Sequence, residues 1–159
     1  MFIVLGLPLL CLFLYIIYCL FFWQWGKNCQ PAYNEEKTLL MGHRGSPTHI
    51  TENTLASFQK AIDQGADGLE FDIRLSKDNQ IAIFHDADLK RLSDCDENIS
   101  DISLTELQTV ELHKKEGQAE DAYIPSLNDL VPLLWQIKVI NIEIKSDGLF
   151  KGRAILKPL

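Results

Sequence analysis

Short apolar runs alternate with helix-like segments after residue 38, and this alternation most constrains the possible folds. The runs predict strands at residues 38–43, 68–75, 80–85 and 138–145. Asn53 or Thr54 can cap a helix after the first strand. Ser103 and Ser126 open capping-box patterns before two further helices. Strands that alternate with helices predict an α/β fold with a mainly parallel sheet.

One predicted connection does not fit this scheme. Only residues 76–79 lie between the second and third strands, whereas a parallel crossover needs a dozen residues or more. Two alternatives follow from the sequence. Either the link runs straight down the sheet, or the two strands form a hairpin.

The start of the chain is uncharged: residues 1–26 contain no Asp, Glu, Lys, Arg or His. As one helix, residues 1–23 would span roughly 35 Å, enough to cross a bilayer core of about 30 Å. No basic residue precedes the run and bulky aromatic residues close it, which favours a single-span anchor over a cleaved signal peptide. Lys27 and Lys37 follow it, so the positive-inside rule favours a cytoplasmic remainder. We therefore expect a transmembrane anchor at 1–26 and a linker at 27–37.

The net charge of −7 belongs wholly to the residues after this leader. They contain no basic block or stripe, which argues against a nucleic-acid binder. The four cysteines have no spacing typical of a zinc site or of a disulfide framework. They are Cys11, Cys19, Cys29 and Cys95.

Charged side chains and histidines gather where the predicted strands end. In chain order they are His43 and Arg44, Glu70 and Asp72, His85 and Asp86, and Glu143 and Lys145. Such positions line the active sites of α/β sheets and barrels. Taken singly, each pair has a plainer interpretation, such as the wet face of a strand or a surface ion pair. Their occurrence at all four strands favours a functional site.

The residue types at these positions suit phosphate chemistry. Glu70 and Asp72 project the same way, and with a third carboxylate they could hold Mg²⁺ or Ca²⁺ rather than Zn²⁺. Two histidines from different strands could act as acid and base across one scissile bond. Arg44 offers a planar fork for a phosphate oxygen.

Several short motifs also follow one another in a characteristic order. They are Gly42-His-Arg-Gly45, Glu52-Asn-Thr54, Gly65-Ala-Asp67, Glu70-Phe-Asp72, His85-Asp86, Ile124-Pro125 and Asn141-Ile-Glu-Ile-Lys145. Over about residues 39–146 this set closely resembles the glycerophosphodiester phosphodiesterase family. The resemblance implies a (β/α)₈ TIM barrel that hydrolyses glycerophosphodiesters to glycerol 3-phosphate and an alcohol in lipid metabolism.

The same resemblance implies a role for each site residue. It makes His43 and His85 the acid/base pair, and Glu70, Asp72 and Glu143 the ligands of a divalent cation, Mg²⁺ or Ca²⁺. Arg44 and Lys145 would contact the substrate phosphate, and Glu52 would support the site.

A complete barrel of this kind needs about 250 residues. We therefore expect residues 38–159 to be the N-terminal half of a TIM barrel, truncated after about four strands. Three interpretations compete. In the first, the chain is a fragment of a membrane-anchored phosphodiesterase. In the second, it has no turnover alone, and it acts through assembly with another half or not at all. In the third, it is a phospholipase D-type lysophospholipid hydrolase. The substrate alcohol and the oligomeric state are not specified by the sequence.

Overall fold

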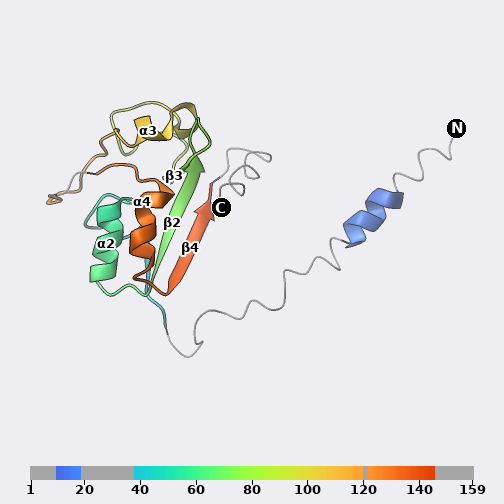
Figure 1. The fold of residues 1–159 in the computed structure, drawn as a ribbon, viewed down its shortest axis with the longest axis horizontal. Helices are drawn as coiled ribbons and strands as arrows, with labels where there is room; N and C mark the ends of the chain where they lie inside the picture. Colours follow the sequence, from blue (N-terminus) through green and yellow to red (C-terminus); the bar gives the residue numbers. More distant parts are fainter. Residues whose placement is uncertain (1–9, 19–37, 120–121, 146–159) are drawn as a thin grey trace. The chain divides into compact units, whose positions relative to one another are not determined.

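The computed structural model describes residues 10–18, 38–119 and 122–145 of the chain (Figure 1). The chain divides into two units, Met1–Lys37 and Thr38–Leu159. In the first unit, residues 10–18 are helical. The second unit contains the sheet and the remaining helices.

The predicted membrane anchor is wrong. Within the described ranges no helix combines the length and the apolar character needed to cross a membrane. The predictions of a single-pass membrane location and of a cytoplasmic remainder are withdrawn with it. The rest of the predicted anchor, the linker at 27–37 and residues 146–159 lie outside the described residues.

The second unit is organised around β2 (Gly68–Leu75), which pairs with the three other strands of a four-stranded sheet. β1 (Met41–His43) and β4 (Val139–Ile144) run parallel to β2, whereas β3 (Ile81–Ile83) is antiparallel. Ile73 of β2 pairs with both β3 and β4, so these two strands lie on opposite edges of β2. Residues 68–70 pair with both β1 and β4, so β1 shares the edge of β3. The predicted α/β fold with a largely parallel sheet is confirmed.

The short link between β2 and β3 is a hairpin, which decides between the two alternatives that the sequence allowed. Ser76 N donates to Gln80 O at 3.0 Å, and Asn79 N donates to Ser76 O at 3.0 Å. Asn79 has φ +59°, a left-handed conformation that asparagine tolerates. β3 therefore runs back along the edge of β2 toward the end of β1.

This reversal brings the ends of two strands toward each other. β1 ends at His43, which pairs with Glu70 of β2. Just after β3, Phe84 N donates to Asp72 O at 3.0 Å. The residues that follow β1 and β3 thus meet along one edge of β2, at positions only two residues apart on that strand.

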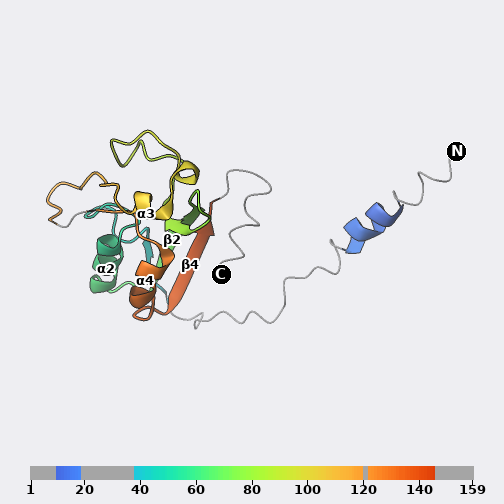
Figure 2. The same cartoon turned by 45° about the horizontal axis from the view of Figure 1, so that its top comes forward.

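Local signals in the sequence place the helices. α2 (Leu55–Asp63) begins at Thr54, whose side chain accepts a hydrogen bond from Ser57 N at 3.2 Å. It ends at Asp63, and two residues later Gly65 has φ +87° and donates its backbone N–H to Ile62 O at 2.8 Å. α4 (Leu127–Leu134) begins with a capping box of Ser126 and Asp129. Figure 2 shows α2 and α4 packed on the same side of β2.

One hydrophobic core lies between the sheet and these two helices. The rings of Phe58 and Phe71 pack edge to face in it, with centroids 5.9 Å apart. Its buried members are Phe58, Ala61, Leu69, Phe71, Ile73, Ile81, Ile83 and Leu130. Because this core takes the apolar face of β2, the carboxylates of β2 point to the opposite face.

A second hydrophobic core supports the long segment between β3 and α4. Its buried members are Ala82, Phe84, Leu89, Leu92, Ile99, Ile102, Leu107, Leu112, Ala122 and Ile124. The segment contains a 3₁₀ turn (Ile99–Asp101) and α3 (Leu104–Leu107). The helix predicted from Ser103 to about Leu112 is shorter, because Leu112 N donates instead to Ala122 O at 2.7 Å.

The turn after β1 yields a test of the fold. Gly45 has φ +87°, and an added Cβ would lie 2.5 Å and 2.7 Å from backbone atoms of Ser57. Gly65 has the same φ but open space around it. We expect Gly65→Ala to cost about 1–2 kcal/mol of unfolding free energy through backbone strain. Gly45→Ala should cost about 1–3 kcal/mol more, because the backbone of α2 must also move. Urea denaturation of both variants measures the difference, and equal losses would contradict the close contact.

Candidate active site

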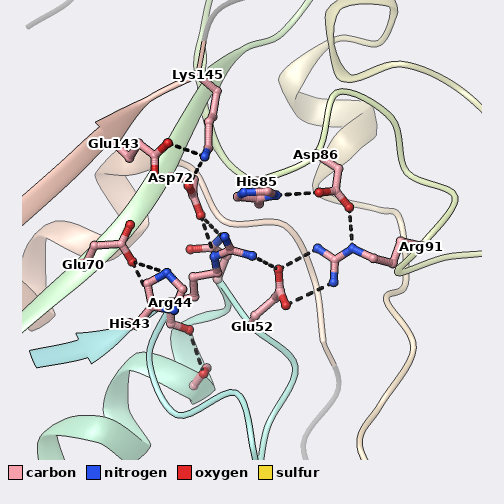
Figure 3. A network of polar contacts seen from close by, with 12 residues as sticks. His43, Arg44, Glu52, Glu70, Asp72, His85, Asp86, Arg91, Glu143 and Lys145 are labelled. Atoms are coloured by element: carbon pink, nitrogen blue, oxygen red, sulfur yellow. Dashed lines mark hydrogen bonds and ion pairs between the residues drawn. The ribbon is translucent and has the colours of Figure 1, made fainter.

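Three carboxylates converge on the polar face of the sheet (Figure 3). Asp72 of β2 pairs in register with Glu143 of β4, and Glu70 lies two residues earlier on β2. One oxygen from each of the three carboxylates lies within 4.8 Å of the others. The parallel register of β2 and β4 therefore assembles the predicted ligand set.

Asp72 is the most enclosed of the three, with its side chain 0% exposed. Asn53 Nδ2 donates to its Oδ2 at 2.9 Å, and Arg44 Nε lies 3.2 Å from the same oxygen. Burial acts to raise the pKa of Asp72, but the Asn53 amide and the charges of Lys145 and Arg44 outweigh it and lower that pKa. Asp72 is therefore held as an anion.

The other oxygen of Asp72 has a weaker environment. Oδ1 lies 3.1 Å from Lys145 Nζ, an ion-pair distance without the alignment of a hydrogen bond. The Lys145 ammonium compensates part of the charge on this buried oxygen, which accepts no well-aligned hydrogen bond. Together with the all-oxygen donor set, this oxygen fits a hard divalent cation.

Glu70 sits beside the turn that follows β1. Arg44 N donates to its Oε2 at 3.1 Å, and His43 Nε2 lies 3.6 Å from the same oxygen. Burial, together with the nearby charge of Asp72, raises the pKa of Glu70. Arg44 adopts φ +56°, a strained conformation for a non-glycine residue, so its backbone N–H and its side chain reach two different carboxylates.

Lys145 follows β4 and contacts two of the three carboxylates. Its ammonium pairs with Glu143 and with Asp72. Burial acts to lower the pKa of Lys145, but these two carboxylates raise it overall. Glu143 is half exposed, so this end of the cluster faces solvent.

A second chain of contacts leads from Arg44 to His85. Arg44 Nη1 donates to Glu52 Oε1 at 3.0 Å, and both Glu52 oxygens also accept from Arg91. Arg91 Nε donates to Asp86 Oδ2 at 2.5 Å, and Asp86 Oδ1 contacts His85 Nδ1 at 2.5 Å. Figure 3 shows this chain beside the carboxylate cluster, with Arg44 common to both.

The carboxylates of this second chain are ionised. Burial acts to raise the pKa of Glu52, but Arg91 and Arg44 outweigh it and lower that pKa. Burial acts likewise on Asp86, where Arg91 and His85 lower the pKa. The two carboxylates in turn raise the pKa of Arg91.

All of the predicted site residues lie on this one face of the sheet. His43 is the most open, with its side chain 66% exposed. His113, which was not predicted as a site residue, pairs with Asp94 at 3.0 Å instead.

The sequence assigned no role in the site to three residues of the network. Asn53 was a candidate helix cap, yet Thr54 caps α2 and Asn53 donates to Asp72 instead. Asp86 was placed beside His85 among the strand-end groups, but its contact with Nδ1 of His85 was not predicted. Arg91 lies in a polar loop that carries no periodicity, so no sequence signal marks it.

The glycerophosphoryl diester phosphodiesterase family profile matches residues 43–148, about two thirds of the chain. The chain belongs to this family. A glycerophosphodiester phosphodiesterase of Caldanaerobacter subterraneus is 35% identical over 112 residues, which are 69% of this chain and 46% of that protein. Lysophospholipase D GDPD1 of Mus musculus is 43% identical over 117 residues, 68% of this chain and 36% of that protein. The chain thus spans about half or less of the length of the curated relatives it matches.

Solved structures of family members share the fold. A glycerophosphodiester phosphodiesterase from Agrobacterium tumefaciens matches with a TM-score of 0.63 and 28% identity, over 69% of this chain and 48% of that one. A phosphodiesterase from Oleispira antarctica, in complex with its product sn-glycerol-3-phosphate, matches with a TM-score of 0.60 and 35% identity. That match covers 68% of this chain and 44% of the other. The fold of the second unit is therefore that of a TIM-barrel-like phosphodiesterase.

The low pKa of Glu52 predicts a pH-dependent stability. A folded-state pKa below the usual 4.5 contributes stability above that value, and the contribution is lost as pH falls through the folded pKa. Glu52→Gln lacks this contribution at every pH. We expect its deficit in unfolding free energy to be constant above about pH 6 and to shrink as pH falls below 4.5. Urea denaturation at several pH values measures it, and a deficit that grows toward low pH would contradict the assignment.

Proposed function

We propose that this chain hydrolyses glycerophosphodiesters to glycerol 3-phosphate and an alcohol. The observation that carries the proposal is the meeting of three carboxylates, two cationic side chains and two histidines on one face of the sheet. The names of the relatives and the product complex of the Oleispira antarctica protein support it. The half-length matches also support our proposal that residues 38–159 correspond to the N-terminal half of a TIM barrel.

Glu70, Asp72 and Glu143 would hold a divalent cation, Mg²⁺ or Ca²⁺. When bound, such an ion polarises a phosphoryl oxygen and offsets negative charge in the transition state. The acidic cluster alone would repel an anionic substrate, so the cationic side chains beside it matter for binding. Arg44 and Lys145 provide them, because both already contact Asp72 and lie next to the cluster.

His43 and His85 would transfer the protons of the reaction. One takes a proton from the attacking water as its oxygen forms the new P–O bond, and the other gives a proton to the oxygen of the leaving alcohol as the old P–O bond breaks. Asp86 contacts Nδ1 of His85, which leaves Nε2 of that ring to exchange the proton. The ends of β1 and β3 bring the two histidines to the same edge of the sheet.

Removal of either histidine tests this proposal. We expect His43→Ala and His85→Ala each to lower kcat for glycerophosphocholine hydrolysis by about 100-fold or more, the usual contribution of a general acid or base. His113→Ala is the matched control, because His113 lies in a loop and pairs with Asp94. It should retain normal turnover in an assay of released glycerol 3-phosphate. Full activity in either catalytic variant would refute the acid/base roles.

Cation binding can be measured separately from turnover. Isothermal titration with Mg²⁺ and with Ca²⁺ should show about 10-fold or more loss of affinity in Glu70→Gln and Glu143→Gln, because each removes an anionic ligand. Lys145→Met should bind the cation at least as tightly as the unmodified chain, since Lys145 competes for two of the same carboxylates. Weaker binding in Lys145→Met would argue against a cation site at this cluster.

A lysophospholipase D activity is the second candidate, favoured by the 43% identity to lysophospholipase D GDPD1 of Mus musculus. Parallel assays with glycerophosphocholine and a lysophospholipid separate the two, by whether free glycerol 3-phosphate or lysophosphatidate is released. Cation binding without turnover on either substrate would instead favour a chain that needs another half to act.

A further inference from the structure

Arg91 joins two carboxylates that come from distant parts of the chain. Its Nη1 and Nη2 donate to the two oxygens of Glu52 at 3.1 Å and 2.7 Å, and its Nε donates to Asp86 at 2.5 Å. The contact with Glu52 is therefore bidentate, the geometry in which a guanidinium binds a carboxylate most specifically. Arg91 thereby ties the loop after β3 to the loop before α2 (Figure 3).

The backbone around Arg91 is fixed by packing. Leu89 and Leu92, on either side of it, are buried in the second hydrophobic core. Leu92 N donates to Leu89 O at 3.1 Å, and Leu92 O accepts from His113 N at 2.7 Å. The backbone at Arg91 is therefore held in place, although the side chain of Arg91 is 46% exposed.

Each carboxylate that Arg91 holds contacts a second residue of the proposed machinery. Asp86 uses its other oxygen for Nδ1 of His85, and Glu52 also accepts from Arg44. A carboxylate that is fixed by a guanidinium cannot rotate freely, so it fixes the ring or side chain that it contacts. The position of Arg91 therefore affects the orientation of both His85 and Arg44.

We propose that Arg91 is a positioning residue that orients His85 through Asp86, an inference that rests on the proposed function. Its main effect is on proton transfer, because Arg91 is the one arginine among the described residues that contacts Asp86, whereas Glu52 keeps its contact with Arg44 when Arg91 is removed. Loss of Arg91 is thus expected to change kcat more than KM. An exposed ion pair with a purely structural role would change neither, since such pairs contribute little.

Four variants of the full chain test the proposal: Arg91→Gln, Arg91→Lys, Asp86→Asn and the double variant Arg91→Gln/Asp86→Asn. We expect Arg91→Gln to lower kcat about 10- to 100-fold with KM changed less than about 3-fold. Arg91→Lys keeps the charge without the bidentate fork, so it should recover part of the loss. If Arg91 acts through Asp86, the double variant should be no slower than Asp86→Asn alone.

Lys90→Gln is the matched control. Lys90 is the neighbouring cation in the same loop and pairs with Asp96 at 2.7 Å, away from the site. It should turn over substrate normally. If Lys90→Gln loses as much activity as Arg91→Gln, the effect belongs to loop stability and the proposal fails.

A spectroscopic readout separates this proposal from the proposed function. The ring nitrogens of His85 can be followed by NMR of the ¹⁵N-labelled chain without substrate, with His85→Ala for assignment. Arg91→Gln should shift or broaden the His85 signals, and Lys90→Gln should not. Unchanged His85 signals in Arg91→Gln, or multiplicative losses of kcat in the double variant, would overturn the positioning role. Absence of turnover in the unmodified chain would count against the proposed function, while the NMR result would still decide the role of Arg91.

Discussion

The buried carboxylate of Asp72 is the constraint on which the rest of the site depends. Removing a carboxylate from water costs several kcal/mol unless donors and cations replace its hydration. Here the replacements come from three separate segments: Arg44 after β1, Asn53 before α2 and Lys145 after β4. All three segments contact the one carboxylate of Asp72. The contacts that neutralise this anion therefore also bring the residues of the site together.

This requirement also explains the strained backbone nearby. Arg44 and Asn53 both have φ +56°, a region that costs non-glycine residues about 1–2 kcal/mol. In this conformation both side chains reach the same carboxylate. Asn53 N also donates to Arg44 O at 3.1 Å, so the two strained residues hold each other in place. The free energy gained by contacting the buried Asp72 carboxylate therefore outweighs the backbone strain at Arg44 and Asn53.

The sequence predicted those parts of the structure that follow from local periodicity. The strict alternation of residues 68–75 predicts the bounds of β2 and the face on which Glu70 and Asp72 lie, and Thr54 and Gly65 lie where α2 begins and ends. His85 reaches the site through the hairpin, one of the two alternatives that the sequence left open. It follows an antiparallel strand that turns back, and does not end a parallel one.

The sequence did not predict side-chain contacts between residues that lie far apart along the chain. Nothing local to Arg91 indicates that it contacts Glu52, thirty-nine positions earlier. The sequence left the cap of α2 open between Asn53 and Thr54, because a helix cap and a donor to a buried anion use the same residue types.

The hairpin between β2 and β3 makes the spacing of the reactive groups a matter of strand register. His43 and His85 approach from opposite directions along one edge of β2, so their separation depends on how many residues the link at 76–80 contains. A one-residue slip of β3 would move its residues about 3.3 Å along β2 and turn each side chain to the opposite face. We therefore expect family members to carry insertions in the surface segment after His85. The link at 76–80 should keep its length, because a change there would move His85 relative to His43.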